Sequence, residues 1–132
     1  MALRRHVIPA DNSCLFHAVA HALELKGAAS ELREMVAGLI LSDPERWSEA
    51  MLGQPPESYA DWIQDQEHWG GGIELAVLAG HYETEMAAVD VQTLRVSIFG
   101  EGQGFKQRIW LIYDGIHYDL LVRAGPEGAG KA

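Results

Sequence analysis

The chain has 132 residues, the size of one ordinary domain, and its single cysteine excludes an internal disulfide and a multi-cysteine zinc site within this sequence. The net charge of −9 argues against a broad nucleic-acid-binding surface, which needs clustered Lys and Arg, and fits a basic or neutral partner or a role in solubility alone. No apolar run is long enough to span a bilayer, and a lone cysteine favours a reducing compartment, so we expect a protein of the cytoplasm or nucleus that binds neither nucleic acid nor membranes.

The first half of the chain carries the signals of helices. After an extended segment over residues 4–9, apolar residues at helical spacing predict helices over residues 14–26, 30–41, 45–52, 57–66 and 73–81. Asn12 or Ser13 is available to cap the first helix, and Gly27 is its expected end. The glycines at 70–72 predict a turn, because consecutive glycines lose much backbone entropy when they are ordered.

The second half of the chain is rich in Val, Ile, Tyr and Phe. This composition predicts strands over residues 85–91, 93–99, 107–114 and 117–122. The glycine-rich loop at 100–104 predicts a hairpin between the second and third of these strands. Helices followed by strands indicate one α+β domain over residues 1–124, and the Gly/Pro/Ala-rich residues 125–132 are expected to form a flexible tail.

Cys14 lies at the start of the first predicted helix. A thiol is mostly protonated at neutral pH, but the N–H groups at a helix N-terminus and a nearby imidazolium both stabilise the thiolate. The same N–H groups can bind the oxyanion that forms when a thiolate attacks a carbonyl group. Taken alone, Cys14 is better interpreted as a small buried apolar residue, so a catalytic interpretation depends on a partner elsewhere in the chain.

A partner for the thiol is present near the other end of the chain. His117 and Asp119 are two residues apart, so on a strand their side chains leave the same face and the carboxylate can orient the imidazole. Without Cys14, this histidine would be interpreted as a hydrogen-bonded edge residue. His17, one helical turn after Cys14, is a competing partner that has no obvious orienting acid. A thiol, an imidazole and a carboxylate together predict a cysteine hydrolase.

Asp11 and Trp69 each admit two interpretations. Asp11 either supports the loop before Cys14 and its oxyanion-binding amides, or is a carboxylate favoured near a helix N-terminus. Trp69 and the glycines after it either border a channel wide enough only for glycine, or Trp69 belongs to the core. The remaining histidines lack paired-ligand spacing with the cysteine, so we expect no metal site and no cofactor.

Four segments together resemble the OTU (ovarian-tumour) cysteine proteases, and most closely the Otu1-type branch with its short plant members. The segments are DNSCLF at 11–16, WGGGIEL at 69–75, VDVQT at 89–93 and LIYDGIHYD at 111–119. They occur in the family's order and at nearly its intervals, and the resemblance runs from about residue 5 to residue 122. It implies a papain-like α+β deubiquitinase that cleaves the isopeptide bond after the C-terminal Gly-Gly of ubiquitin.

The resemblance also implies roles for individual residues. By motif position, Cys14 is the nucleophile, His117 the general base and Asp119 the orienting acid, while Asp11 is the acidic residue of the nucleophile loop. The implied substrate contacts are Ile116, Trp69, Gly70 and Gly71. A protease for another ubiquitin-like modifier and a noncatalytic ubiquitin-binding domain are the alternatives, and the intact set of three catalytic residues weighs against the second.

The same resemblance bears on partners. We expect a monomer that binds ubiquitin or polyubiquitin, whose basic tail suits a channel rimmed by acids such as Asp61, Asp65 or Glu67. Gly72 stands where the family more often has alanine. This sequence contains neither the C-terminal zinc finger usual in the branch nor the N-terminal domain that docks the ubiquitin-selective AAA ATPase, so we do not expect docking through that domain.

Overall fold

The structure is a computed structural model that describes residues 3–123, so the predicted tail at 125–132 lies outside the described residues. The helices are α1 (Cys14–Ala22), α2 (Ala29–Ser42), α3 (Glu49–Leu52), α4 (Pro56–Gln64) and α5 (Gly72–Tyr82). The strands are β1 (Leu3–His6), β2 (Thr84–Asp90), β3 (Val96–Phe99), β4 (Gln107–Tyr113) and β5 (Tyr118–Arg123). This order of elements confirms the predicted α+β class.

The five strands form one sheet in the order β1-β5-β4-β2-β3. β2 and β4 run parallel, and the other neighbouring strands are antiparallel. The predicted hairpin across residues 100–104 is therefore wrong, because β3 pairs with β2 and β4 lies on the other side of β2. The turn that closes the β2–β3 pair is built on Asp90, whose carboxylate accepts hydrogen bonds from the N–H groups of Gln92 and Thr93.

Two predicted helices differ from the observed ones at their ends. α1 stops at Ala22, so the prediction that Gly27 ends it is wrong. Glu24 has a φ of 55° and closes the helix, with the Leu25 N–H donating to the Ala20 carbonyl at 2.9 Å. The helix predicted over residues 45–52 is reduced to α3, because Ser48 provides the N-cap and its side chain accepts from the Met51 N–H.

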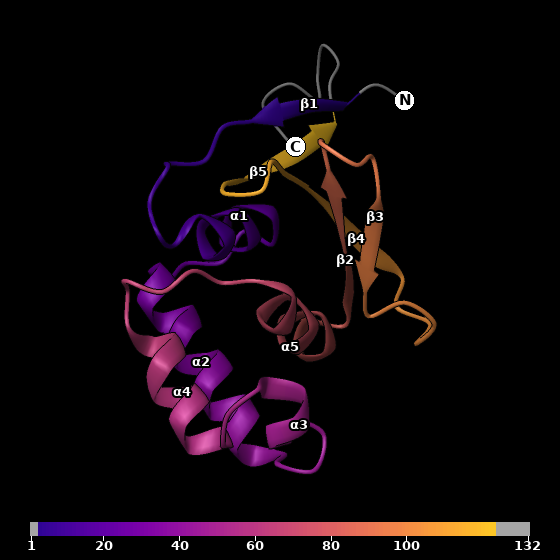
Figure 1. Cartoon of the computed structure of the whole chain (residues 1–132). Coiled ribbons are helices and arrows are strands. Elements are labelled where there is room, and N and C mark those ends of the chain that lie inside the picture. Colours follow the sequence, from indigo (N-terminus) through magenta and orange to yellow (C-terminus); the bar gives the residue numbers. More distant parts are fainter. Residues whose placement is uncertain (1–2, 124–132) are drawn as a thin grey trace.

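The sheet lies at one end of the molecule and α2, α3 and α4 lie at the other, with α1 and α5 between them (Figure 1). α1 contacts β5, α5 contacts β2 and β3, and α2 contacts α1, α4 and α5. The fully buried side chains that fill this contact zone include Phe16, Leu75, Met86, Leu111 and Leu120. Each stabilises the fold by about 1.5–3 kcal/mol, so the start of α1 is fixed against β5. Across residues 3–123, every helix is too short or too polar to cross a membrane.

Candidate active site

Cys14 is the first residue of α1, and it contacts the segment that the sequence predicted as its partner. Its side chain is buried, with 7% of the residue exposed, and its Sγ accepts a hydrogen bond from the Tyr118 N–H at 3.4 Å. Tyr118 is the first residue of β5 and follows His117 directly. The packing of α1 on β5 therefore places the thiol beside the histidine across 104 positions of sequence.

His117 is paired with Asp119, as the spacing of two residues predicts. The imidazole Nε2 lies 2.7 Å from Asp119 Oδ1, and both side chains are largely shielded from solvent, with 20% and 8% exposed. An ionised carboxylate can only accept hydrogen bonds, so Nε2 carries the ring proton. Nδ1 is then the ring nitrogen that can accept a proton. Among the described residues, the thiol and the imidazole make no direct hydrogen bond, and catalytic hydrogen bonds often tighten only when substrate binds.

Strand β1 and the segment directly after it provide further partners for Asp119 that the sequence analysis missed. The Ile8 N–H donates to Asp119 Oδ1 at 2.7 Å, and Arg5 Nε lies 3.5 Å from Oδ2. β1 pairs with β5 in antiparallel register, with Arg5 opposite Leu121. A main-chain amide leaves no signal in a sequence, so only the pairing of β1 with β5 could reveal that the carboxylate is oriented from two sides.

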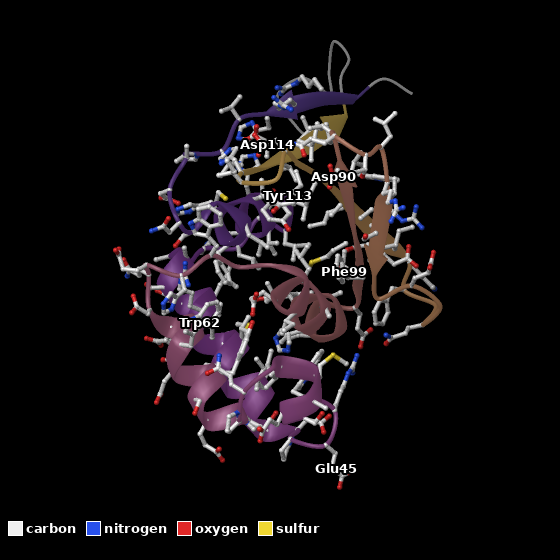
Figure 2. The ribbon with its side chains drawn as sticks, in the orientation of Figure 1. Glu45, Trp62, Asp90, Phe99, Tyr113 and Asp114 are labelled. Carbon is white, nitrogen blue, oxygen red and sulfur yellow. The ribbon has the colours of Figure 1, made fainter. Side chains whose placement is uncertain are left out.

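The loop before His117 is built on Asp114, which the sequence analysis also did not single out. Asp114 Oδ1 accepts from the N–H groups of Ile116 and His117 at 2.9 and 2.7 Å, and these bonds lower the pKa of that carboxyl. Figure 2 shows Asp114 and Tyr113 at the end of β4 near Asp90 at the end of β2. The pattern of an aspartate followed by Gly115, which has a φ of 102°, is a turn signal that could have identified this loop. The turn leaves Ile116, the residue before His117, exposed.

Asp11 pairs with a different histidine from the one next to the thiol. Its Oδ1 accepts from the Ser13 N–H at 2.8 Å, and its Oδ2 lies 3.1 Å from His17 Nε2. The first contact agrees with the interpretation that Asp11 supports the loop before Cys14. The second supplies the carboxylate that His17 lacked in the sequence analysis. The two aspartates therefore serve two imidazoles, and Asp119 is the one bound to His117.

Trp69 and Gly70 contact the nucleophile segment directly. Trp69 is 51% exposed, which excludes the core interpretation, and its indole N–H donates to Asn12 Oδ1 at 2.6 Å. Gly70 packs on α1 so closely that an added Cβ would lie 3.0 Å from the Phe16 ring. A side chain at this position would thus require the buried Phe16 ring to shift, so the packing of the loop on the helix favours glycine.

The glycine segment also lines a pocket of about 380 Å³. Its wall is made of Leu52, Gln54, Tyr59, Trp62, residues 69–73 and Glu74. Glu74 accepts from the Gly71 N–H at 2.7 Å and from the Tyr59 hydroxyl, and burial raises its pKa. The acids expected at the rim of a channel, Asp61, Asp65 and Glu67, are exposed and do not line this pocket.

Residues 9–120 match the family of OTU-like cysteine proteases. The chain belongs to this family. It is 46% identical over 129 residues to the human (Homo sapiens) protein named ubiquitin thioesterase OTU1, covering 95% of this chain and 37% of that protein. It is 45% identical over 126 residues to ovarian tumor domain-containing deubiquitinating enzyme 2 of Arabidopsis thaliana, covering 95% of this chain and 61% of that one. The chain thus spans less than two thirds of these curated relatives.

A solved OTU domain in complex with ubiquitin has the same fold as this one. The two match with a TM-score of 0.85 and 36% sequence identity, over 91% of this chain and 69% of the other. The papain-like α+β OTU fold expected from the four motifs is therefore confirmed. Within residues 3–123 of this OTU domain, no three His, Cys, Asp or Glu side chains are grouped as a metal site requires.

The pKa of the Cys14 thiol in this OTU domain differs from the expectation. Burial raises the pKa of the Cys14 thiol above its ordinary value, and the Asp11 carboxylate raises it further, whereas the N–H groups of Tyr118 and Leu15 lower it. In this structure, burial therefore outweighs the stabilisation of the thiolate that the helix N-terminus provides.

We expect Asp11→Asn to lower the pKa of Cys14, because the substitution removes a negative charge that disfavours the thiolate. The rate of alkylation by iodoacetamide, measured over a pH series, should then reach its midpoint at lower pH than in the wild type. Asp43→Asn is the matched control, because Asp43 also accepts from a main-chain N–H, that of Arg46, but does not act on Cys14. A midpoint that moves to higher pH in Asp11→Asn would contradict this account.

Proposed function

We propose that this chain is a cysteine-dependent deubiquitinase, which hydrolyses the isopeptide bond after the C-terminal Gly-Gly of ubiquitin through a thioester at Cys14. The observation that carries the proposal is that Cys14 Sγ lies 3.4 Å from the main-chain nitrogen of Tyr118. Tyr118 directly follows His117, whose imidazole is hydrogen-bonded to Asp119. The names of the relatives, ubiquitin thioesterase and deubiquitinating enzyme, support ubiquitin as the substrate. So does the ubiquitin complex of the similar OTU domain.

In the proposed reaction, His117 is the general base. Its Nδ1 takes the proton of the Cys14 thiol, and the sulfur attacks the carbonyl carbon of the last ubiquitin glycine. We propose that N–H groups at the start of α1 bind the oxyanion of the tetrahedral intermediate. When this collapses, the imidazolium gives its proton to the leaving lysine amine and the thioester remains. Water, deprotonated by His117, then hydrolyses the thioester.

The burial of the thiol makes a base necessary. Burial raises the pKa of Cys14, so the thiol needs a group that takes its proton, and in the proposed reaction that group is His117. Asp119 fixes the imidazole in the tautomer that leaves Nδ1 free and stabilises the imidazolium as it forms.

Two exposed side chains beside the site are proposed to contact the ubiquitin tail. Ile116, 67% exposed, precedes His117, and Trp69 is bound through its indole to Asn12 next to the nucleophile. Gly70 and Gly71 continue the chain from Trp69 and present main-chain surface only. We infer that the last glycines of ubiquitin lie between these two edges, with ubiquitin or polyubiquitin as the partner. A monomeric state and a location in the cytoplasm or nucleus stay predictions from the sequence.

The test is a panel of probes, each a ubiquitin-like modifier with a C-terminal electrophile, incubated with equal amounts of the protein. We expect an adduct with the mass of one ubiquitin, attached at Cys14 as identified by peptide mass spectrometry, and slower labelling by the other modifiers. If only a probe built on another modifier forms an adduct, that modifier and not ubiquitin is the substrate. Binding of ubiquitin without any adduct would identify a noncatalytic domain and overturn the proposal.

A further inference from the structure

Arg33 of α2 is a fully buried arginine that makes no ion pair among the described residues. It is 0% exposed, and its guanidinium stacks on the Phe16 ring with its central carbon 4.7 Å from the ring centre. Its N–H groups donate only to neutral oxygens, which are the carbonyls of Asn12, Ile63, Asp65 and His68 and the hydroxyl of Ser13. A buried charge is costly, so its presence calls for a role that a neutral side chain could not fill.

Three of the five acceptors of Arg33, those of Asn12, Ser13 and His68, belong to the two segments that form the candidate site. We call residues 11–14 the nucleophile loop and residues 68–71 the glycine loop. One nitrogen, Nη2, lies 3.0 Å from the Asn12 carbonyl, 3.0 Å from Ser13 Oγ and 2.6 Å from the His68 carbonyl. A single atom therefore joins the residue before the nucleophile to the residue before Trp69.

Other contacts support the same junction. The Trp69 indole donates to the Asn12 side chain, so the two loops are also joined at the surface, above the buried guanidinium. Phe16, on which the guanidinium stacks, is the ring against which Gly70 packs. Nη1 extends the network to the end of α4 through the Ile63 carbonyl at 2.7 Å.

We propose that Arg33 is a positioning residue for the reaction. It fixes the nucleophile loop against the glycine loop, so that Cys14 and the bound substrate tail are aligned for the reaction. The proposal rests on the proposed deubiquitinase function. Its physical basis is the guanidinium itself, the side chain that offers five N–H donors in one fixed plane. Arg33 uses them on five acceptor groups, and no other side chain could satisfy all five.

The main test is Arg33→Lys, which keeps the positive charge but offers three donors to the five acceptors. We expect kcat for a ubiquitin C-terminal fluorogenic amide to fall by about 10–100-fold, because a displacement of about 1 Å at the reacting atoms costs about that much. KM should change by less than about threefold, because the reacting atoms and not the bulk of the contact surface are displaced. Val36→Ala is the control, since Val36 is fully buried on the same helix and does not contact either loop by a hydrogen bond.

A second measurement does not depend on ubiquitin. Hydrogen exchange should speed up in Arg33→Lys at residues 12–16 and 68–71 and stay unchanged in β2, whereas a general loss of stability would speed it up throughout. If the wild type turns over no ubiquitin substrate, the proposed function fails, and this measurement still tests Arg33.

Ser13→Ala removes only the side-chain acceptor in the nucleophile loop, and it serves where Arg33→Lys does not fold. We expect a smaller loss of kcat in the same direction, and a double variant no more than about twofold slower than Arg33→Lys, because both substitutions break one network. The proposal is overturned if Arg33→Lys and Val36→Ala differ by less than about twofold in kcat. It is also overturned if Ser13→Ala leaves kcat unchanged or exchange rises uniformly.

Discussion

Cys14→Ala is expected to abolish turnover of ubiquitin substrates, with a loss of about 10⁴–10⁶-fold in kcat. The substitution removes the only thiol in the chain, and the proposed thioester can form at no other side chain. Single-turnover cleavage of a ubiquitin isopeptide and covalent labelling by a ubiquitin electrophile both measure the loss. Turnover by the alanine variant at the wild-type rate would end the cysteine-protease assignment of the site.

Cys14→Ser separates chemistry from structure in the same experiment. Alanine leaves the buried Tyr118 N–H without its acceptor, which costs about 1–3 kcal/mol of the free energy of unfolding. A serine hydroxyl keeps an acceptor at this place but is a far weaker nucleophile. We therefore expect both variants to be inactive and the serine variant to unfold at higher urea concentration than the alanine variant. Ubiquitin binding, measured by calorimetry, should persist in both.

Asp119→Ala should have the second largest effect, lowering kcat by about 10²–10³-fold. The carboxylate determines which ring nitrogen of His117 carries the proton, and without it the imidazole loses both its tautomer and its orientation. The same substitution leaves the Ile8 N–H without its acceptor, at a cost of about 1–3 kcal/mol in the free energy of unfolding. Steady-state kinetics and urea unfolding, run at one temperature, measure the two effects.

Asp119→Asn and Asp11→Ala are the controls for that prediction. The asparagine oxygen can still accept from Ile8, so stability should be largely retained while kcat falls by an intermediate factor. Asp11→Ala removes the partner of His17 and of the Ser13 N–H, and we expect a smaller loss of kcat than for Asp119→Ala. The opposite ranking of the two alanine variants would transfer the orienting role to Asp11.

The parts of the site that the sequence predicted depend on local patterns. Cys14 at a helix start follows from polar residues before an apolar helical run, and this pattern is encoded within a few residues. The contact of His117 with Asp119 follows from a spacing of two at a strand, which puts both side chains on one face whatever the strand pairs with. The α+β class likewise follows from the sequence pattern, which changes from apolar residues at helical spacing in the first half of the chain to strand-forming residues in the second half.

The errors in the predicted fold have a common cause. The hairpin at 100–104 was expected between neighbours in sequence, but β4 pairs in parallel with β2, and strand order depends on contacts that no local pattern encodes. α1 ends at Ala22 and is closed by Glu24 in a left-handed conformation, although glycine is the residue that usually takes this conformation. At both places the packing of the whole domain outweighed the local preference.

By itself, the sequence predicted the cysteine at a helix start, the pairing of His117 with Asp119 and the α+β class, because each depends on residue types at short spacing. Only the tertiary structure decided which groups surround them. Ile8 and Asp119 are 111 positions apart, and Arg33 reaches acceptors 20 to 35 positions away. The raised pKa of Cys14 arises in the same way, since it depends on how deeply α1 is buried against β5. Burial and main-chain hydrogen bonds arise only when the chain packs, so they cannot be predicted from local sequence patterns.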